Sequence, residues 1–279
     1  MVSCKDYVEI QKQLLKEKIS TFERKPKLCV VQIGNDPASN SYIKGKRKDC
    51  EEVGVIFNHL HIANYEDVSQ VVLMDMISTI NADHTTDGII IQLPIPDKYN
   101  IEELQKCISP DKDVDGFRID SRFKPCTPKG VIELLKYNKY DFSGKIACVV
   151  GRSDIVGKPL AEMLTNLDAT VILCHSKTSK EQLTKLISAS DIVFTCINQI
   201  EYFNSSDFYS WQDIIDIGLG RGVDGKLHGN IEGKSVEILK ERNYGHFVIS
   251  GTGNTGLLTR ESLLENTVEA CELHLKGTK

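Results

Sequence analysis

Two residues that could do chemistry, Tyr42 and Lys46, lie four positions apart in the stretch SYIKGKRKDC. The preceding NDPAS is typical of a helix start, and residues four apart on a helix share one face. In a structural interpretation, the ring is half-buried and the lysine stem runs beside it to water. In a chemical interpretation, the ring holds a planar substrate and the amine transfers protons. The spacing alone leaves both open.

An amide and a carboxylate are expected near the same helix. The buried run DGIIIQL predicts a strand with Gln92 at its carboxyl end, where Pro94 stops the sheet ladder. Ligands of open α/β sheets bind outside the carboxyl ends of the strands, and the helix with Lys46 begins at this same end. Gln92 can therefore meet Lys46. Asp115, in KDVDG, either joins them around a heteroaromatic substrate or forms an ordinary turn with the glycine that follows.

The second half of the chain contains a glycine turn between an apolar run and a helical pattern, CVVGRSDIVGKPLAEML. Gly151 ends the predicted strand and Gly157 stands near the predicted helix start. Glycines allow a close backbone approach, and free N–H groups at a helix N-terminus attract a pyrophosphate. The spacing G-x-x-x-x-x-G differs from the usual G-x-G-x-x-G, so an ordinary tight turn without a ligand is the alternative.

The end of the next predicted strand favours NADP over NAD. An NAD site usually has an acid there for the ribose 2′-hydroxyl, but this strand ends in CHSKT, which contains none. His175, Ser176 and Lys177 suit a 2′-phosphate instead, together with Arg152 from the glycine turn. The alternative is a plain helix cap at Ser176 followed by a solvated lysine.

Short apolar runs alternate with helical patterns almost throughout, which predicts parallel sheets covered by helices on both faces. The segment 109–130 has little periodicity and divides this pattern into two halves. The last helix is expected from about Thr259, with one apolar stripe. The expected strands are 27–34, 55–62, 87–93, 145–151, 169–174, 191–196, 213–218 and 246–250.

Composition and charge argue against several functional classes. The 279 residues suit one large or two modest domains, and the formal charge of −5 argues against a nucleic-acid partner. Nine cysteines without a C-x-x-C pair indicate buried thiols in a reducing compartment. His59 and His61 lack an evident third ligand, so no metal is expected. The polar N-terminus and the lack of a membrane-length apolar run predict a cytoplasmic protein without a membrane partner.

In combination these segments resemble the methylenetetrahydrofolate dehydrogenase/methenyltetrahydrofolate cyclohydrolase family over nearly the whole chain. The ordered motifs are DPASNSYIKGK, QLPIP, KDVDGF, PCTPKG, GRSDIVGKP, CHSKT, DGKLHG and LLENTVEA. The resemblance implies an α/β homodimer of two-domain chains, with folate in the cleft between the domains. A folate domain is expected at 1–118, completed by the last helix at 259–279, and a Rossmann-type NADP-binding domain at 119–258.

The resemblance also implies a role for each matched residue. The family's Y-x-x-x-K falls on Tyr42, whose ring stacks on folate, and on Lys46, the main catalytic group of the cyclohydrolase step. Gln92 positions that lysine, and Asp115 hydrogen-bonds the pterin. The further substrate contacts are Leu93, Gly253, Gly256 and Thr259, and the cofactor contacts are Gly151, Arg152, Ser153, Ile155, Val156, Gly157, His175 and Ser176.

The implied reaction has two stages and belongs to one-carbon metabolism and purine biosynthesis. Hydride leaves 5,10-methylenetetrahydrofolate for NADP, and water then converts the methenyl product to 10-formyltetrahydrofolate. A lysine that is partly neutral near physiological pH assists the proton transfers of the second stage, and burial beside a neutral amide favours that state.

Departures from the family pattern generate two alternatives. The stretch TGNTGLLT (252–259) lacks both prolines of the family's loop, which predicts a more mobile or reshaped wall of the folate pocket. The link FRIDSRFK (117–124) is short, which predicts a changed cleft, and Asn230 stands where the family often has aspartate. One alternative is a dehydrogenase with weak or lost cyclohydrolase activity. The other is a catalytically silent folate- or nucleotide-binding protein.

Overall fold

The computed structural model describes residues 3–243 and 245–277, which form two compact units. The lysine unit, named here for Lys46, comprises Asp6–Cys126 and Arg260–Lys279. The glycine-turn unit, named for the turn from Gly151 to Gly157, comprises Met1–Lys5 and Thr127–Thr259.

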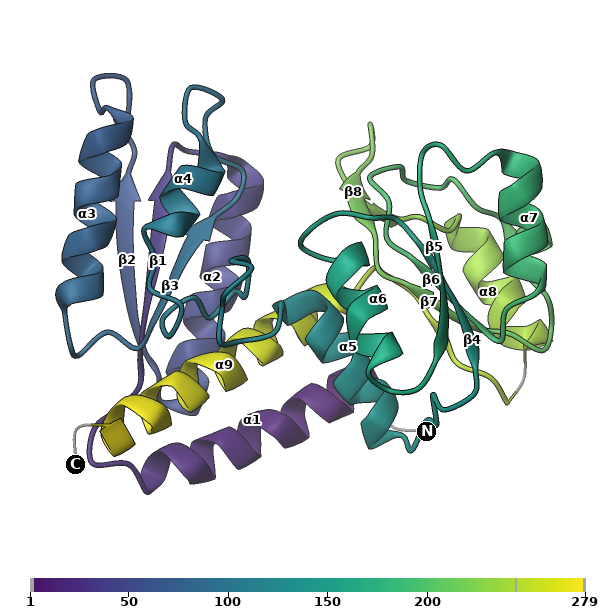
Figure 1. Cartoon of the computed structure of the whole chain (residues 1–279), viewed down its shortest axis with the longest axis horizontal. Coiled ribbons are helices and arrows are strands. Elements are labelled where there is room, and N and C mark those ends of the chain that lie inside the picture. Colours follow the sequence, from purple (N-terminus) through teal and green to yellow (C-terminus); the bar gives the residue numbers. More distant parts are fainter. Residues whose placement is uncertain (1–2, 244, 278–279) are drawn as a thin grey trace. The chain divides into compact units, whose positions relative to one another are not determined.

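The lysine unit is built around a three-stranded parallel sheet. Its elements are β1 (Lys27–Ile33), α2 (Pro37–Val53), β2 (Ile56–Ile62), α3 (Gln70–Ala82), β3 (Gly88–Gln92), α4 (Ile101–Lys106), and most of α1 (Cys4–Ser20) and α9 (Thr255–Gly277). The strand order is β2-β1-β3 (Figure 1). In the register of β1 and β3, Gln32 is opposite Gln92. The strands are parallel, so their carboxyl ends lie at one edge of the sheet.

Helices cover both faces of this sheet, as its continuous apolar strands require. One face of β1, with Leu28 and Val30, packs in a core that includes α2 and residues Leu264 and Val268 of α9. The opposite face, which includes Val31, packs in a core with α3 and α4. Successive residues of a strand point to opposite faces, so β1 contributes to both cores.

The ends of α2 follow from its sequence. Asp36 caps the N-terminus by accepting a hydrogen bond from the Ser39 N–H at 2.7 Å, and Pro37 occupies the first turn. Gly54 ends the helix in the left-handed conformation, with φ 92°. Because α2 starts soon after β1, its first turns stand at the carboxyl edge of the sheet.

The glycine-turn unit has a five-stranded parallel sheet and a separate antiparallel pair of strands. Its elements are α5 (Cys126–Tyr137), β4 (Ile146–Val150), α6 (Gly157–Thr165), β5 (Thr170–Cys174), α7 (Lys180–Ser188), β6 (Ile192–Thr195), the 3₁₀ helix η1 (Ser205–Asp207), β7 (Asp213–Asp216), β8 (Leu219–Arg221), β9 (Leu227–Gly229), α8 (Gly233–Arg242) and β10 (Val248–Ile249). The large sheet has the order β10-β7-β6-β4-β5, and Figure 1 shows α5 and α6 on one face and α7 and α8 on the other. The expected fold class, with mainly parallel sheets covered by helices, is confirmed.

Two local features differ from the sequence-based expectations. The antiparallel pair β8–β9 is absent from the predicted strands, although Asp224-Gly225 between its halves is a hairpin signal. α9 starts at Thr255 instead of about Thr259, so the second half of 252–259 is the first turn of a helix and not a loop. An apolar stripe indicates the middle of a helix better than its ends, so it does not reveal this first turn.

The cysteines and the helices bear on the expectations about compartment and membrane. The nine cysteines all lie within the described ranges, where each is a free thiol and all but Cys107 are buried. Cys29, Cys148 and Cys174 lie inside β1, β4 and β5, as their apolar surroundings predict. Among residues 3–243 and 245–277, no helix is long and apolar enough to cross a membrane.

At the amino end of the lysine unit's sheet, a buried carboxylate joins three segments. Asp87 has no exposed surface and accepts two hydrogen bonds from the Arg24 guanidinium, at 2.6 Å each. The Lys27 N–H and the His274 ring each approach the same carboxylate at 2.9 Å. Burial opposes the charged form, but the bonds from Arg24, His274 and Lys27 outweigh it and hold the pKa of Asp87 below its ordinary value.

Replacing Asp87 with asparagine is expected to lower the free energy of unfolding by about 2–4 kcal/mol, because Arg24 loses its carboxylate partner. Because the folded-state pKa of Asp87 is depressed, its contribution is present above the ordinary pKa of about 4 and is lost as the pH falls through the folded value. Urea unfolding at neutral and acidic pH measures both effects. The exposed Asp97→Asn is the control, with an expected change under about 0.5 kcal/mol. Equal stability of the two variants at neutral pH would contradict the prediction.

Candidate active site

Lys46 is a buried lysine on α2 whose ammonium group contacts the end of β3. Its Nζ donates a hydrogen bond to Oε1 of Gln92 at 3.0 Å, and the residue is 6% exposed. The Gln92 Nε2 donates to the Leu93 carbonyl at 2.8 Å, which orients the amide with its oxygen toward the lysine. The Ser39 hydroxyl donates to the same carbonyl at 3.1 Å. The structure thus brings two predicted site residues from different elements into direct contact.

The surroundings of Lys46 favour the neutral amine. Burial is the main cause that lowers the pKa of Lys46. The Asp115 carboxylate and two cysteines oppose this effect, the Arg260 guanidinium adds to it, and the net shift is downward. Gln92 accepts the lysine's hydrogen bond without adding a counter-charge. A lysine in these surroundings can accept a proton at a pH where an exposed lysine is almost fully protonated.

Tyr42 lies one helical turn before Lys46 on the same face of α2. The Lys46 Nζ is 5.4 Å from the centroid of the tyrosine ring, which is half-buried. The neighbouring cations Lys44, Arg47 and Lys48 are exposed. The helix thus keeps one aromatic ring and one buried amine together, while its other cationic residues near Lys46 are exposed.

Asp115 lies in a segment that α9 holds in place. Asn266 of α9 donates to the Val114 carbonyl at 2.9 Å. Burial raises the pKa of Asp115, while the charge of Lys46 and a hydrogen bond from Cys126 oppose that effect. Asp115 and Lys46 therefore influence each other's charge, which sets the aspartate apart from an ordinary turn residue.

The first aspartate of KDVDG has a different, structural environment. One Asp113 carboxylate oxygen accepts from the Arg118 N–H at 2.8 Å, and the Asp113 carbonyl accepts from the Ser121 hydroxyl at 3.0 Å. Burial raises the pKa of Asp113 to about 6. Gly116 then turns the chain with φ 72°, and a Cβ there would lie 2.7 Å from the backbone of Lys124. The turn that carries Asp115 therefore depends on this glycine.

In the glycine-turn unit, the turn from β4 to α6 has no room for side chains at its two glycines. Gly151 has φ 133°, and a Cβ on it would lie 2.3 Å from the Cys196 carbonyl oxygen. A Cβ on Gly157 would lie 2.0 Å from the Gly151 carbonyl oxygen. Ser153 closes the turn, because its Oγ accepts long hydrogen bonds from the Val156 and Gly157 N–H groups, at 3.2 and 3.4 Å.

A second turn lies beside the first at the carboxyl edge of the sheet. The Gly151 N–H donates to the Cys174 carbonyl at 2.9 Å, so the segments after β4 and β5 are neighbours. In the second turn, the Lys177 N–H donates to Nδ1 of His175 at 3.2 Å, and the His175 N–H donates to the Thr178 hydroxyl at 3.1 Å. These bonds leave Ser176 and Lys177 exposed.

Together the two turns fit the phosphate groups of a dinucleotide. Glycine backbone that excludes every Cβ lets a phosphate approach closely, and the N-terminus of α6 favours negative charge. Arg152 and Lys177 are exposed cations on adjacent turns, and the Ser153 hydroxyl can also donate to an oxyanion. Ile155 is 37% exposed and supplies an apolar surface beside them.

A buried polar cluster at the ends of β6 and β7 lies outside the sequence-based site prediction. Asp216 accepts from the Thr195 hydroxyl at 2.7 Å and from the Asn230 N–H at 3.1 Å, and burial raises its pKa. The Asn230 side chain accepts from the Ile197 N–H at 3.0 Å and donates to the Gln199 carbonyl at 2.7 Å. Aspartate could not donate to that carbonyl, so asparagine suits this position. An acid inside the apolar run DIIDIG is the sequence signal that could have indicated the cluster.

The residues predicted from the stretch 252–259 belong to the glycine-turn unit. Gly253 turns the chain with φ 79°, and Gly256 lies in the first turn of α9. The Thr259 hydroxyl donates to the Thr255 carbonyl at 2.8 Å and lies 2.9 Å from the Thr127 hydroxyl. The first turn of α9 is thus held by hydrogen bonds of the Thr259 side chain.

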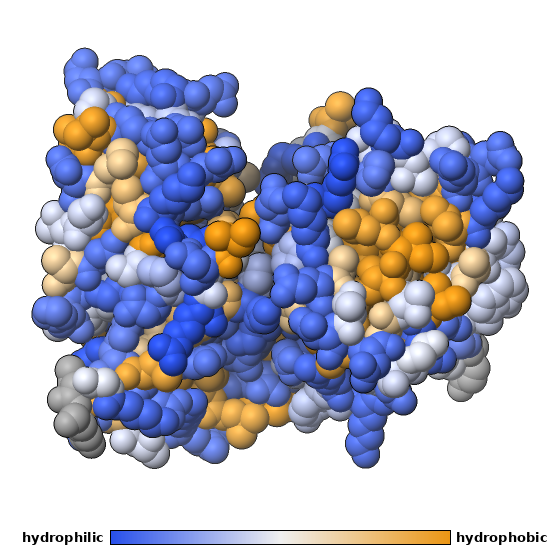
Figure 2. Space-filling model, in the orientation of Figure 1, coloured by the Kyte–Doolittle hydropathy of each residue, from blue (hydrophilic) through white to orange (hydrophobic). Residues whose placement is uncertain are grey.

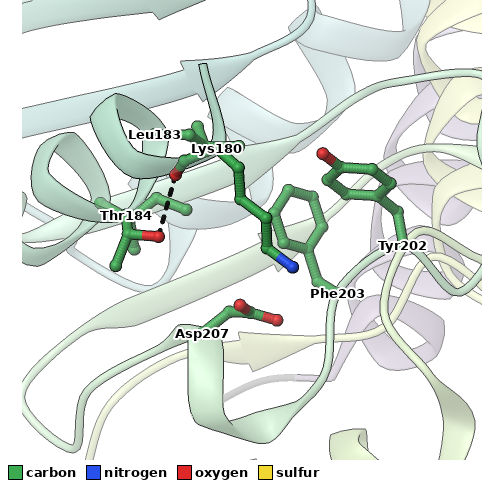
Figure 3. Close-up of a pocket in the computed structure, with 7 residues that line it drawn as sticks. Lys180, Leu183, Thr184, Tyr202, Phe203 and Asp207 are labelled. Atoms are coloured by element: carbon green, nitrogen blue, oxygen red, sulfur yellow. Dashed lines mark hydrogen bonds between the residues drawn. The ribbon is translucent and has the colours of Figure 1, made fainter. Parts of the chain in front are cut away.

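A small surface pocket of the glycine-turn unit shares no residue with these turns. Figure 3 shows the Lys180 ammonium group between the Asp207 carboxylate and the Tyr202 ring, with Phe203 behind them. Within the described parts of the chain, no group of three His, Cys, Asp or Glu side chains could hold a metal ion. The pocket is lined by Lys180, Leu183, Thr184, Ile187, Tyr202, Phe203 and Asp207.

Comparison with known proteins extends this picture to the whole chain. The family model "Tetrahydrofolate dehydrogenase/cyclohydrolase, catalytic domain" matches residues 2–115, and the model of the family's NAD(P)-binding domain matches residues 125–275. The chain therefore belongs to the tetrahydrofolate dehydrogenase/cyclohydrolase family. The bifunctional protein FolD of Ruminiclostridium cellulolyticum is 38% identical over 268 residues, which cover 92% of this chain and 91% of that protein. FolD of Bacillus subtilis is 37% identical over 257 residues, covering 88% and 87%.

Solved structures agree with the sequence comparison. The bifunctional FolD enzyme of Campylobacter jejuni, a methylenetetrahydrofolate dehydrogenase/cyclohydrolase, matches with a TM-score of 0.90 and 32% identity over 97% of this chain and 98% of that one. The bifunctional dehydrogenase/cyclohydrolase of Thermoplasma acidophilum matches with a TM-score of 0.85 and 26% identity over 96% of each chain. The family resemblance inferred from the ordered motifs is confirmed.

The glycine turn makes a sharp stability prediction. Gly157→Ala is expected to lower the free energy of unfolding by about 1–3 kcal/mol, because its Cβ meets a backbone oxygen that cannot rotate away. Gly233, which begins α8 as Gly157 begins α6, is the matched control, since a Cβ there meets nothing within 4 Å. Gly233→Ala should be neutral or stabilising by about 0.5–1 kcal/mol. Thermal unfolding of both variants is the measurement, and similar melting temperatures would contradict the prediction.

Proposed function

We propose that this chain is a bifunctional enzyme of one-carbon metabolism. It oxidises 5,10-methylenetetrahydrofolate to the methenyl form with NADP and hydrolyses that product to 10-formyltetrahydrofolate. The observation that carries the proposal is the contact between the buried Lys46 amine and the oriented Gln92 amide, in a chain of this family. A buried amine whose pKa is lowered by its surroundings suits a proton-transfer step.

The lysine unit is proposed to bind folate. Tyr42 offers a half-buried ring on which a flat heterocycle can stack. Asp115 offers a carboxylate, which can accept hydrogen bonds from the amino and ring N–H groups of a pterin. Leu93 lies next to Gln92 and is proposed to contact the same heterocycle. For Gly253, Gly256 and Thr259, folate contact is proposed from motif position.

The glycine-turn unit is proposed to bind NADP. The cofactor accepts a hydride from the one-carbon bridge of the substrate. Residues of the turn are proposed to bind its phosphates through backbone groups, since the glycines allow the chain to turn tightly between β4 and the N-terminus of α6. Arg152 and Ser176 are proposed to bind the 2′-phosphate, with His175 beside them, and the absence of an acid in CHSKT supports NADP over NAD. The other proposed contacts are Gly151, Ser153, Ile155, Val156 and Gly157.

Hydrolysis is proposed to depend on Lys46 as a general base. Water adds to the electrophilic methenyl carbon and loses a proton as the new C–O bond forms. The neutral Lys46 amine accepts that proton, and the resulting ammonium can return it to the ring nitrogen that leaves when the C–N bond breaks. The proton that remains on the new hydroxyl passes to water as the formyl C=O forms. The Gln92 oxygen keeps Nζ in place through both charge states, because it accepts a hydrogen bond from either form.

The domain boundaries are proposed from these roles. Residues 1–118 with the helix 259–279 form the folate domain, and residues 119–258 form the NADP domain. The compact units differ slightly from these ranges. The boundaries between the units lie at residues 126–127 and 259–260, and residues before Asp6 belong to the glycine-turn unit. Most proposed folate contacts then fall in the folate domain and the cofactor contacts in the NADP domain, while the folate contacts Gly253 and Gly256 lie in the NADP domain.

A homodimer formed through β5, in the cytoplasm, is also proposed. β5 is an edge strand, and its residue Leu173 is 38% exposed. Figure 2 shows apolar surface over the region of β5 and β6 in the glycine-turn unit. An exposed edge strand has unpaired backbone N–H and C=O groups that can pair with another strand. A second copy of this chain offers the same edge across a two-fold axis. The free thiols suit a reducing compartment.

The function is tested by turnover of 5,10-methylenetetrahydrofolate with NADP⁺ and NAD⁺ in parallel. Reduced cofactor, methenyl- and 10-formyltetrahydrofolate are quantified for the parent and for Lys46→Met. The parent should form both products, faster with NADP⁺. Lys46→Met should slow hydrolysis by about 10²–10⁴-fold, the usual effect of losing general base assistance. The exposed Lys48→Met is the matched control and should retain activity.

Each outcome of this assay has a clear meaning. Reduced cofactor with methenyl product that disappears no faster than in buffer would show a dehydrogenase without cyclohydrolase activity. No reduction with either cofactor by folded protein would overturn the enzyme assignment in favour of a silent binding protein. Faster turnover with NAD⁺ would overturn the proposed role of Arg152.

The dimer proposal predicts that Leu173→Lys converts the protein to a monomer, because two charges would meet in an apolar interface. Val223→Lys is the matched control, since Val223 is a fully exposed apolar residue of the same unit. Sedimentation velocity distinguishes the two species. A parent that sediments as a monomer, or a Leu173→Lys variant that remains dimeric, would contradict the proposal.

A further inference from the structure

Arg260 of α9 lies against the helix that carries the catalytic lysine. Its Nε is 2.7 Å from an Asp49 carboxylate oxygen. We propose that Arg260 is a positioning residue for the hydrolysis step. Seated over Gly45 and paired with Asp49, its guanidinium fixes a positive charge beside Lys46, so that the lysine works as a neutral base. The inference rests on the proposed function and adds a residue that the family motifs do not indicate.

The Arg260 guanidinium lies against α2 at Gly45, where the helix has no side chain; this position is called the seat. Gly45 is a helix-interior glycine, which weakens a helix relative to alanine. A Cβ on Gly45 would lie 2.2 Å from Nη1 of Arg260 and 3.1 Å from its Cζ. The guanidinium therefore occupies the space that a side chain at residue 45 would take. Residue 45 immediately precedes Lys46, so the positive charge of Arg260 lies against the turn of α2 that carries the lysine.

A buried ion-pair cluster keeps the guanidinium in this seat. Asp49 is 4% exposed and lies between two cations, Arg260 on one oxygen and Lys12 of α1 on the other, at 2.8 Å. Lys12 is also 2.9 Å from Glu52. Asp49 is thus shared between Arg260 and Lys12, and Glu52 is a second partner of Lys12. The cluster connects α1, α2 and α9 of the lysine unit.

The sign of the effect on Lys46 follows from the groups that face it. Burial lowers the pKa of Lys46, and Asp115, Cys126 and Cys50 oppose that effect. Arg260 acts in the same direction as burial, because two positive charges repel. Gln92 and the Tyr42 ring add no net charge. Removing the guanidinium should therefore raise the pKa of Lys46 and reduce the fraction of neutral amine at a given pH.

The first test is the pH dependence of methenyltetrahydrofolate hydrolysis at saturating substrate. Arg260→Met keeps the stem and removes the charge. Its acidic limb should move to higher pH by about half a unit or more, with the rate at high pH retained. Arg260→Lys, which keeps a charge, should fall between that variant and the parent. Lys12→Met loosens the same cluster without removing the guanidinium, and its profile should match the parent's.

The second test uses the seat itself. Gly45→Ala displaces the guanidinium while every charge remains, so it should move the acidic limb in the same direction, by less. In the Arg260→Met background the same alanine should have no effect on the profile, because no charged group is left to displace. An unchanged profile in Gly45→Ala, or an equal shift in both backgrounds, would overturn the proposed seat.

A direct probe of the amine separates this inference from the proposed function. Competitive acetylation with acetic anhydride across a pH series, read by mass spectrometry, reports the titration of Lys46 without any turnover. Arg260→Met should move that titration upward, even in a protein found to be inactive. An unshifted titration, or a shift as large in Lys12→Met or Arg260→Lys, would overturn the role of the Arg260 charge. An inactive parent with the shift would overturn only the enzyme assignment.

Discussion

The burial of one ammonium group against a neutral amide is the constraint on which the proposed active site depends. Burial of the charged form of Lys46 away from water is energetically unfavourable. Gln92 accepts the lysine's hydrogen bond without supplying a counter-charge. The surrounding elements make this arrangement possible: a capped helix starts at the carboxyl edge of the sheet, and a buried strand ends opposite it. The result is an amine whose protonation state is set by the fold.

Much of the fold could be predicted from the sequence because its strands are continuous apolar runs between helical patterns. Such runs, for example GIIIQ and IACVV, are buried on both faces and specify parallel sheets whatever the details of the loops. The pair β8–β9 is short and polar, so its pattern is weak despite the Asp224-Gly225 signal. The start of α9 at Thr255 could not be predicted from the apolar stripe, which does not mark the first turn of a helix.

The residues of the candidate site could be predicted from the sequence only where a short local pattern contains them. Tyr42 and Lys46 share a helix face by spacing, and Gln92 follows from where its strand ends. Arg260 could not be predicted in this way, since it is more than two hundred residues from Asp49 along the chain and meets it through tertiary packing. The same holds for Asn230, whose side-chain amide hydrogen-bonds the backbone of Ile197 and Gln199 through tertiary packing.

The account is tested most directly by titrating lysine Nζ signals of the parent protein by ¹⁵N NMR, with Lys46 assigned by comparison with Lys46→Met. Lys12, on which two carboxylates act to raise the pKa, is the internal reference. The account predicts that Lys46 loses its proton at a lower pH than the exposed lysines, and Lys12 at a higher one. A Lys46 that titrates with the exposed lysines would contradict the claim that the fold sets it as a neutral base.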